Sequence, residues 1–311
     1  MLSDMTLGNA GRIHFVGIGG IGMSALAQLL VHQGKEVSGC DREEQPTTTL
    51  LKEREIVVSV GHDERHIVHG VDLLIYSAAI PEEHPERIRA KELGISGMNY
   101  FEALGEVSKE MYTIAVSGTH GKTTTTGMVA KILIDAGLSP TVVVGSMLKD
   151  FGGNFIAGKS DLFVVEACEY RRHFLHLHPR VLIINNIELD HPDYYKNLAD
   201  VQDAFAAFAR SVPEDGAVVT NPNDERIAAA LGGLSCTGID YTKERIYRLK
   251  LPGAHNLANA QAAKAAVKAL KRDVSDESIN ISLVSFRGTW RRFEYKGKTK
   301  IRRTHLHFRR R

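Results

Sequence analysis

The chain has 311 residues, of which 43% are hydrophobic and 24% charged, and its formal net charge is only +2. This is the composition of an ordinary globular protein with room for two domains, and so small a charge excludes a strong general attraction to nucleic acid or to an anionic membrane. We expect a cytoplasmic protein, because no apolar run reaches the length of a membrane span and the N-terminal segment lacks the layout of a secretory signal. Cys40, Cys168 and Cys236 are few and widely spaced, which argues against a disulfide framework and against a structural zinc site.

The first motif is a glycine cluster that follows a short apolar strand. Residues 12–17, RIHFVG, predict the strand, and Gly17, Gly19 and Gly22 match the pattern G-x-G-x-x-G at the start of a helix. Asp41 lies about twenty positions further on, where an acidic residue contacts a ribose in dinucleotide-binding folds. The pattern predicts a pyrophosphate at the helix N-terminus. A dinucleotide cofactor, a nucleotide-sugar and a tight turn without a ligand all remain open on these residues.

Strands and helices alternate through the rest of the first domain. Further strands are predicted over 36–39 and 71–77, and helices over 83–93 and 100–109. Such alternation is typical of a parallel sheet with helices on both faces. We therefore predict an α/β fold whose first domain, residues 1–110, is a Rossmann-like sheet.

A shortened phosphate-binding loop opens the second domain. Residues 112–126, YTIAVSGTHGKTTTT, run from an apolar strand through glycines into a helix. The general signature has four residues between its glycines, whereas two separate Gly118 from Gly121. Glycines let backbone N–H groups approach phosphate oxygens, Lys122 can reach the terminal phosphates, and the Thr123 hydroxyl can bind Mg²⁺. The alternative is a glycine turn that happens to precede Lys-Thr.

Polar side chains follow two further predicted strands. The strand over 161–166 ends on Glu166, at the sheet edge where ligands of open parallel sheets bind, so Glu166 is a candidate Mg²⁺ ligand. The next strand leads into NIELDHPD, residues 186–193. His191 could ligate a second metal ion, with Asp190 orienting it. A solvated histidine is the ordinary alternative for His191 alone.

An alanine-rich helix is predicted to begin near residue 253 and to end near residue 270. His255, Asn256 and Asn259 share its first turns and could hydrogen-bond the edge of a base, although capping by Asn256 explains the same spacing. The second domain, an ATP-binding α/β unit of the P-loop type, is expected to span 111–288. Its other strands are predicted near 141–144, over 180–185 and over 217–220.

The order of these motifs resembles the Mur ligase family over nearly the whole chain, from about Arg12 to about Gly297. The first and last of the motifs resemble the member of the family that acts on UDP-N-acetylmuramate and L-alanine. The motifs, in order, are GIGGIGMS, SGTHGKTT, a glutamate at a strand end, NIELDH, GAHNLANA and RGTWRRFE.

The resemblance implies a role for each motif. The UDP-sugar pyrophosphate would bind at the first glycine cluster, with Asp41 nearby. The ATP phosphates would bind at the second, with Thr123 on Mg²⁺ and with Glu166 and His191 each holding a metal ion, and adenine would contact His255, Asn256 and Asn259. Arg292 would meet phosphate near a third domain, and the catalytic set would be Lys122, Glu166, His191 and Arg292. The UDP-sugar glycines are Gly17, Gly19, Gly20 and Gly22, and the ATP loop comprises Gly118, Thr119, His120, Gly121, Lys122, Thr123 and Thr124.

The resemblance also implies a reaction: ATP-dependent ligation of L-alanine to UDP-N-acetylmuramate in peptidoglycan precursor synthesis. A carboxylate and an amine in water exchange a proton instead of forming an amide. Phosphorylation of the carboxylate by ATP gives an acyl phosphate, which the amine can attack. Mg²⁺ and Lys122 would offset the repulsion between the two anions. A sister ligase that adds another amino acid or a peptide, and a non-catalytic binder of ATP and UDP-sugar, are the alternatives; neither nucleic acid, a membrane nor a protein partner is expected.

Two departures from the family pattern stand out. The stretch between Asp224 and His255 is short, so some strands of the second domain are expected to be missing. Residues 289–311 are expected to be a remnant or aberrant start of the third domain, with that domain itself absent and the chain inactive alone. From about Lys298 the sequence is strongly basic, which we interpret as a shifted or truncated reading frame, with a solvated tail or a nucleic-acid-binding arm as alternatives.

Overall fold

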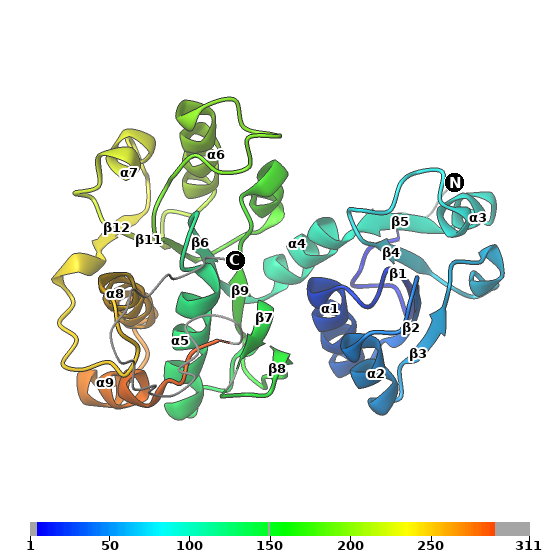
Figure 1. The fold of residues 1–311 in the computed structure, drawn as a ribbon, viewed down its shortest axis with the longest axis horizontal. Helices are drawn as coiled ribbons and strands as arrows, with labels where there is room; N and C mark the ends of the chain where they lie inside the picture. Colours follow the sequence, from blue (N-terminus) through cyan, green and yellow to red (C-terminus); the bar gives the residue numbers. More distant parts are fainter. Residues whose placement is uncertain (1–4, 149, 290–311) are drawn as a thin grey trace, which may run out of the picture.

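The computed structural model describes residues 5–148 and 150–289, which form two α/β units, each built on its own sheet (Figure 1). Helix α4, Tyr100–Glu110, leads from the first unit into the second. Among the helices of these described residues, none is long and apolar enough to cross a membrane.

The first sheet has five parallel strands in the order β3-β2-β1-β4-β5. This order reverses direction between β1 and β4, and ligands of open parallel sheets commonly bind at such a reversal. The strands are β1 (Arg12–Val16), β2 (Glu36–Asp41), β3 (Val57–Val60), β4 (Leu73–Tyr76) and β5 (Ser96–Asn99). The helices are α1 (Ile21–His32), α2 (Pro46–Glu53), η1 (Glu64–His66) and α3 (Pro85–Glu92).

Alternation along β1 assigns its side chains to two different layers. Ile13 and Phe15 pack with Leu26 and Leu29 of α1, whereas Val16 packs with Ala90 of α3 on the other face. This follows from the two-residue period of a strand. The expected parallel sheet with helices on both faces is therefore present.

The second sheet has seven strands in the order β12-β11-β10-β6-β9-β7-β8. Strand β6 (Tyr112–Ser117) lies in the interior, between β9 (Leu162–Glu166) and β10 (Val181–Ile184), and pairs in parallel with both. All pairs are parallel except β7 with β8. The other strands are β7 (Thr141–Leu148), β8 (Gly153–Ile156), β11 (Ala217–Thr220) and β12 (Thr237–Asp240).

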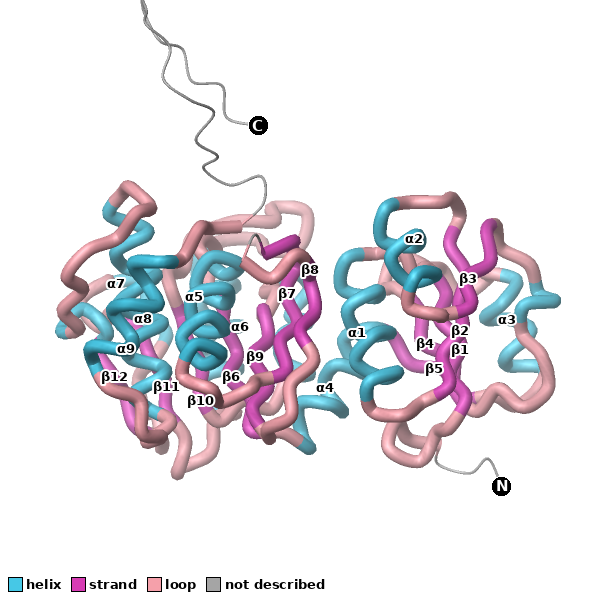
Figure 2. The backbone as a smooth tube through the Cα atoms, turned by 90° about the horizontal axis from the view of Figure 1, so that it is seen from below, coloured by secondary structure: helices cyan, strands magenta, loops and turns pink. Residues whose placement is uncertain are grey.

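Helices cover both faces of the second sheet. Helix α5 packs with α8 and α9 over one face, where Ile114, Val116 and Ile183 point, while α6 covers the face to which Leu182 and Ile184 point. Figure 2 shows α5, α8 and α9 together on one side of the strands. The bounds are α5 (Lys122–Asp135), η2 (Tyr170–His176), α6 (Leu198–Arg210), α7 (Glu225–Ala230), η3 (Tyr241–Lys243), α8 (Ala254–Ala269) and α9 (Asp276–Ser285).

The two units touch where α1 faces β7 and β8 (Figure 2). The Asn154 side chain donates to the Ile21 carbonyl at 2.6 Å and to the Ser24 hydroxyl at 3.1 Å. His32 Nε2 lies 3.0 Å from the Gly158 carbonyl. These bonds join the start and the end of α1 to the second sheet, so the glycine loop before α1 faces the second unit.

The structure contains elements that the sequence patterns did not indicate: α2, β3, β5, β8, β12 and α9. Strand β8 is antiparallel because a hairpin returns the chain at the sheet edge. The short stretch between Asp224 and His255 holds α7, β12 and η3, and Asp224 caps α7 by accepting from the Arg226 N–H. The sheet therefore ends on β12, without a gap among its described strands.

Two strand glycines make a matched test of packing. A Cβ on Gly39 would lie 2.7 Å from the Phe15 carbonyl and from Ile18 Cδ1, whereas a Cβ on Gly238 would meet nothing within 4 Å. We expect Gly39→Ala to lower the free energy of unfolding by about 1–3 kcal/mol, as overpacking does. Gly238→Ala should be neutral or slightly stabilising, because alanine loses less backbone entropy. Urea unfolding curves measure both; equal losses would contradict the packing of β1 against β2.

Candidate active site

The loop between β6 and α5 has the backbone of a phosphate cradle. Gly121 is the N-cap of α5 with φ of 85°, and Gly118 has φ of 126°, both in the region that side chains disfavour. A Cβ on Gly118 would lie 3.0 Å from the Asn185 backbone nitrogen, and one on Gly121 2.4 Å from Asn259 Oδ1. Glycine is therefore required twice, and helix α5 starts with its N–H groups directed toward the loop.

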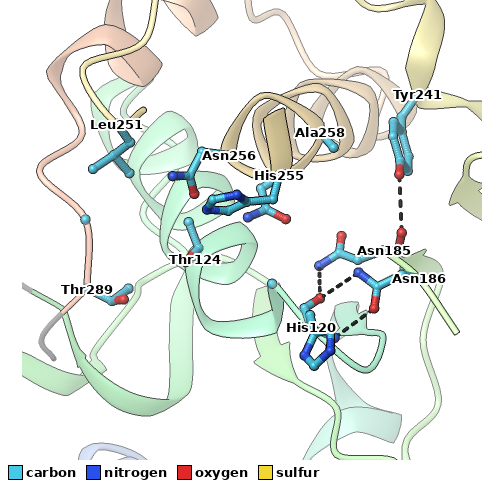
Figure 3. A pocket seen from close by; sticks show the side chains of 13 residues that line it. His120, Thr124, Asn185, Asn186, Tyr241, Leu251, His255, Asn256, Ala258 and Thr289 are labelled. Atoms are coloured by element: carbon cyan, nitrogen blue, oxygen red, sulfur yellow. Dashed lines mark hydrogen bonds between the residues drawn. The ribbon is translucent and has the colours of Figure 1, made fainter. Parts of the chain in front are cut away.

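Two asparagines at the end of β10 hold this loop from the side (Figure 3). The His120 backbone N–H donates to Asn186 Oδ1 at 2.8 Å, and the amides of Asn185 and Asn186 both donate to the His120 carbonyl at 3.2 Å. Thr119 adds a second link, because its hydroxyl accepts from the Glu188 N–H at 2.8 Å. The loop shape thus depends on a neighbouring strand as well as on its own glycines.

Lys122 forms a largely buried ion pair. Its Nζ donates to Glu169 Oε2 at 2.9 Å and to the Gly118 carbonyl at 2.7 Å. The side chain of Glu169 is 3% exposed and that of Lys122 16%, so water screens the pair little. Glu169 follows β9, which brings a buried carboxylate beside the phosphate loop. This residue was missed by sequence reasoning, although it lies three positions after Glu166.

Glu166, the predicted metal ligand, lies beside Thr123. The Thr123 hydroxyl donates to Glu166 Oε1 at 3.0 Å, and the Gly145 N–H donates to Oε2 at 3.0 Å. The Thr123 hydroxyl and the Glu166 carboxylate both offer oxygen, the donor that Mg²⁺ prefers. Their separation is close to the roughly 2.9 Å between adjacent ligands of an octahedral Mg²⁺ site. The donor set therefore fits the expected ion.

His191 lies in a different donor set. Its Nε2 is 3.7 Å from Glu169 Oε1, and Glu169, Asp190 and His191 offer ligand atoms within 4.8 Å of one another. His191 has φ of 55°, and Arg171 and Arg172 in η2 also have positive φ. Backbone conformations of this kind persist only where the surroundings impose them. The structure thus separates the predicted metal ligands into two sets, Thr123 with Glu166 and His191 with Glu169 and Asp190. Lys122 lies between them, because it precedes Thr123 and donates to Glu169.

A cavity of about 450 Å³ opens between the phosphate loop and the start of α8. His255, Asn256 and Asn259 line it, as do Tyr241 and Thr124 (Figure 3). The N-cap of α8 is Gly253, with no side-chain hydrogen bond, and the Asn256 amide donates to the Pro252 carbonyl at 2.7 Å. Asn256 therefore does not act as the capping residue that the alternative interpretation required.

The first glycine cluster lies where the order of its sheet reverses. Gly17 has φ of 81°, and a Cβ on Gly22 would lie 2.6 Å from the Tyr100 ring. Asp41 is buried, and its carboxylate accepts from the Gly19 N–H at 2.8 Å and from the Gln45 amide at 3.0 Å. Asp41 thus holds the loop in place from beneath.

Two adjoining cavities connect the glycine loop with Lys122. One of about 460 Å³ is lined by Gly20, Gly22 and Arg171, among others. The next, of about 280 Å³, is lined by Lys122 and Glu166, among others. Gly22, Tyr100, Phe101 and His173 line both. The rings of Phe101 and His173 are stacked, with centroids 3.7 Å apart.

The structure therefore brings most of the predicted residues to a continuous region that spans both sheets. Lys122, Thr123 and Glu166 lie together, the residues of α8 line the neighbouring cavity, and the first glycine cluster borders a cavity on the other side. Arg292 lies outside the described residues. Sequence reasoning missed Glu169, Asn185 and Tyr241 in particular; a polar residue that ends or follows a buried strand is the signal that could have found the first two.

Comparison with known proteins agrees with this geometry. Residues 12–112 match the model of the Mur ligase family, catalytic domain, and residues 116–246 that of the Mur ligase middle domain. The chain is 42% identical to a UDP-N-acetylmuramate–L-alanine ligase from Clostridium acetobutylicum over 92% of its own length and 68% of that protein. A protein of the same description from Clostridium novyi is 39% identical over 93% and 69%. The chain belongs to the Mur ligase family.

Solved structures show the same relationship. UDP-N-acetylmuramate-alanine ligase from Thermotoga maritima superposes with a TM-score of 0.76 at 32% identity, over 93% of this chain and 71% of that one. A UDP-N-acetylmuramate:L-alanyl-gamma-D-glutamyl-meso-diaminopimelate ligase from Neisseria meningitides gives 0.82 at 27% identity, over 90% and 99%. The expected α/β fold is thereby confirmed, and so is membership of a family of ligases.

The Lys122–Glu169 pair is suited to a double-mutant test. Lys122→Met leaves the Glu169 charge buried, and we expect a loss of unfolding free energy on the order of 3 kcal/mol. Adding Glu169→Gln removes the uncompensated charge and should restore most of that loss. Urea unfolding of the two single variants and the double variant gives the coupling energy; additive losses would contradict a direct interaction between the two charges.

His173 makes stability depend on pH. Burial, together with the positive charges of His176 and Arg171, lowers the pKa of His173 from 6.5 to about 4. The unfolded chain therefore takes up this proton first as the pH falls, so the His173 contribution destabilises the fold progressively between pH 6.5 and 4 and is constant outside that window. His173→Gln should lose less stability over this range than the unsubstituted chain. Parallel slopes of unfolding free energy against pH for His173→Gln and the unsubstituted chain would disprove the assignment.

Proposed function

We propose that this protein catalyses the ATP-dependent ligation of L-alanine to UDP-N-acetylmuramate. The observation that carries the proposal is the pair of cavities that connects a glycine loop of the first sheet with Lys122 and Glu166 of the second. Such an arrangement suits two anionic substrates that must meet at one point. The identities to the clostridial relatives favour this substrate pair.

ATP fits the second unit. The loop between Gly118 and Thr124 presents backbone N–H groups and a helix N-terminus to the phosphates. His255, Asn256 and Asn259 line a cavity of about 450 Å³ in which adenine would bind. Thr123 and Glu166 would hold Mg²⁺, and the set of Glu169, Asp190 and His191 is the candidate for a second cation. Bound Mg²⁺ supplies charge stabilisation on the phosphate oxygens.

The sugar nucleotide would bind at the first sheet. The N–H groups after β1 and the start of α1 offer the pyrophosphate site, with Gly17, Gly19, Gly20 and Gly22 leaving room for it. The neighbouring cavity leads toward Lys122, where the muramate carboxylate would meet the terminal phosphate of ATP. Arg171, which lines the same cavity, adds a positive charge.

The chemistry then follows from the groups around the smaller cavity. The carboxylate attacks the terminal phosphorus, ADP leaves, and an acyl phosphate forms. The alanine amine attacks the acyl carbon, loses a proton and expels phosphate. Lys122, which now bonds Glu169 and loop carbonyls, would exchange those bonds for phosphate oxygens and stabilise their charge. The buried carboxylate of Glu169 keeps this ammonium in place before ATP arrives.

One observation favours a second candidate function. The Neisseria meningitides ligase, whose second substrate is a tripeptide, gives a higher TM-score than the alanine ligase from Thermotoga maritima, 0.82 against 0.76. The sequence identity runs the other way, 27% against 32%. A sister ligase that adds a peptide to UDP-N-acetylmuramate is therefore the alternative. Offering L-alanine and L-alanyl-γ-D-glutamyl-meso-diaminopimelate in the same assay separates the two functions.

Titration calorimetry and phosphate release test the proposal. We expect binding of Mg²⁺–ATP and of UDP-N-acetylmuramate, and release of phosphate only when L-alanine is also present. The double variant Lys122→Met/Glu169→Gln, which keeps the buried charges balanced, should bind Mg²⁺–ATP about 10–100-fold more weakly, as expected for the loss of a bond to a charged group. Gly238→Ala serves as the control, since its site lies in an edge strand.

The clostridial relative extends beyond the part that aligns, so phosphate release should be measured for this chain and for a chimera that continues into the rest of that relative. Release that depends on both substrates in either protein supports the proposal. Failure of both to bind ATP, or ATP affinity that is unchanged in the double variant, would refute it.

A further inference from the structure

A second cluster of polar side chains lies inside the first unit, on the sheet face that α3 covers. Its members come from separate segments: His14 from β1, Cys40 from β2, His62 from the loop after β3, and Glu86 from the first turn of α3. Val16 and Leu74 of the neighbouring apolar core share this face. The active-site cavities have no member of this cluster in their linings.

The donor atoms lie at coordination spacing. His14, Cys40 and Glu86 are buried, and their ligand atoms lie within 4.8 Å of one another. Cys40 Sγ is 3.0 Å from both Glu86 oxygens, and His14 Nε2 is 3.4 Å from Oε2. His62 Nδ1 is 3.3 Å from the same sulfur. A tetrahedral zinc ion has ligands roughly 3.3–3.7 Å apart, which the two histidine distances match, whereas the contact between the sulfur and the carboxylate would lengthen slightly on binding.

His14 is oriented as a metal ligand would be. Its Nδ1 lies 2.9 Å from the Ser38 hydroxyl, whose strand pairs with β1 at this position. Its Nε2 lies 3.4 Å from Glu86 Oε2 but forms no hydrogen bond with a described residue, although only 4% of the side chain is exposed. Histidine ligands usually use the second ring nitrogen for such an outer hydrogen bond, which fixes the ring. An orphaned buried nitrogen directed at a carboxylate and a thiol indicates a missing partner.

The charges of the cluster also suit a divalent cation. A thiolate, a carboxylate and two neutral imidazoles sum to −2, so a divalent metal ion would make the buried site neutral. Metal binding would release the thiol proton of Cys40 to solvent.

We propose that His14, Cys40, Glu86 and His62 form a binding site for a divalent transition-metal ion, with Zn²⁺ the best match to this donor set. His62 lies on the side that is open to solvent, with 23% of its side chain exposed, and provides the path of entry. The ion joins β1, β2, the loop after β3 and α3, and so stabilises the first unit. The wide spacing of the cysteines argued against zinc because motif-type sites use close pairs; here the tertiary fold assembles the donors.

Cobalt titration of the whole purified chain tests the site. After treatment with a chelator, Co²⁺ should bind at one equivalent and give the intense visible bands of a tetrahedral site with thiolate-to-metal charge transfer, and Zn²⁺ should displace it. Cys40→Ser should abolish the charge-transfer band, whereas Cys236→Ser, outside the cluster, should keep it. Ser38→Ala removes only the outer hydrogen bond to His14 and should weaken Co²⁺ binding about 10–100-fold without loss of fold.

The titration of unsubstituted protein does not depend on any variant folding. Lack of a saturable band at one equivalent there would overturn the proposal, as would a Cys40→Ser protein that keeps the charge-transfer band. Should Cys40→Ser fail to fold, Ser38→Ala decides: an affinity equal to that of the unsubstituted chain would mean that the ion binds elsewhere. Because ATP binding is measured separately, failure of this site would leave the proposed ligase function unaffected.

Discussion

The buried ion pair of Lys122 and Glu169 joins the phosphate loop to the end of the neighbouring strand β9. A charge this deeply buried is stable only with its partner, so the pair fixes where the loop lies relative to the sheet. The asparagines at the end of β10 hold the other side of the loop. The glycine loop before α5 is therefore held by three neighbouring strands, β9, β6 and β10, whose carboxyl ends meet at one edge.

Both sheets contain a point at which the strand order reverses. In the first sheet the order reverses between β1 and β4, and in the second the chain visits β9 on one side of β6 before β10 on the other. Each reversal leaves a crevice where a glycine loop precedes a helix. Hydrogen bonds from Asn154 to both Ile21 and Ser24 hold α1 against the second sheet. Between the two crevices lies a cavity that is lined by Gly22 of the first unit and by Lys122 of the second.

Local sequence patterns predicted much of this arrangement. The apolar strands and the glycine loops were identified because strand, turn and helix signals follow one another within a few residues. Strands β3 and β12 were not predicted, because they are short edge strands with exposed positions, which give little hydrophobic periodicity. Glu169 was missed although it follows a buried strand, because that position alone does not distinguish a buried, paired glutamate from a solvated one. His14 appears in the sequence as one polar residue in an apolar strand, and its neighbours Cys40 and Glu86 are remote along the chain.

The sequence by itself determined the class of fold, the two glycine loops and the membership of a ligase family, because these depend on patterns of residues close along the chain. Only the tertiary structure decided which carboxylates face Lys122 and Thr123, how the Asn185 and Asn186 amides support the loop, and that a histidine, a cysteine and a glutamate converge beneath α3. Those arrangements depend on strand order and on burial. Strand order is set by the packing of whole sheets, and no local pattern records it.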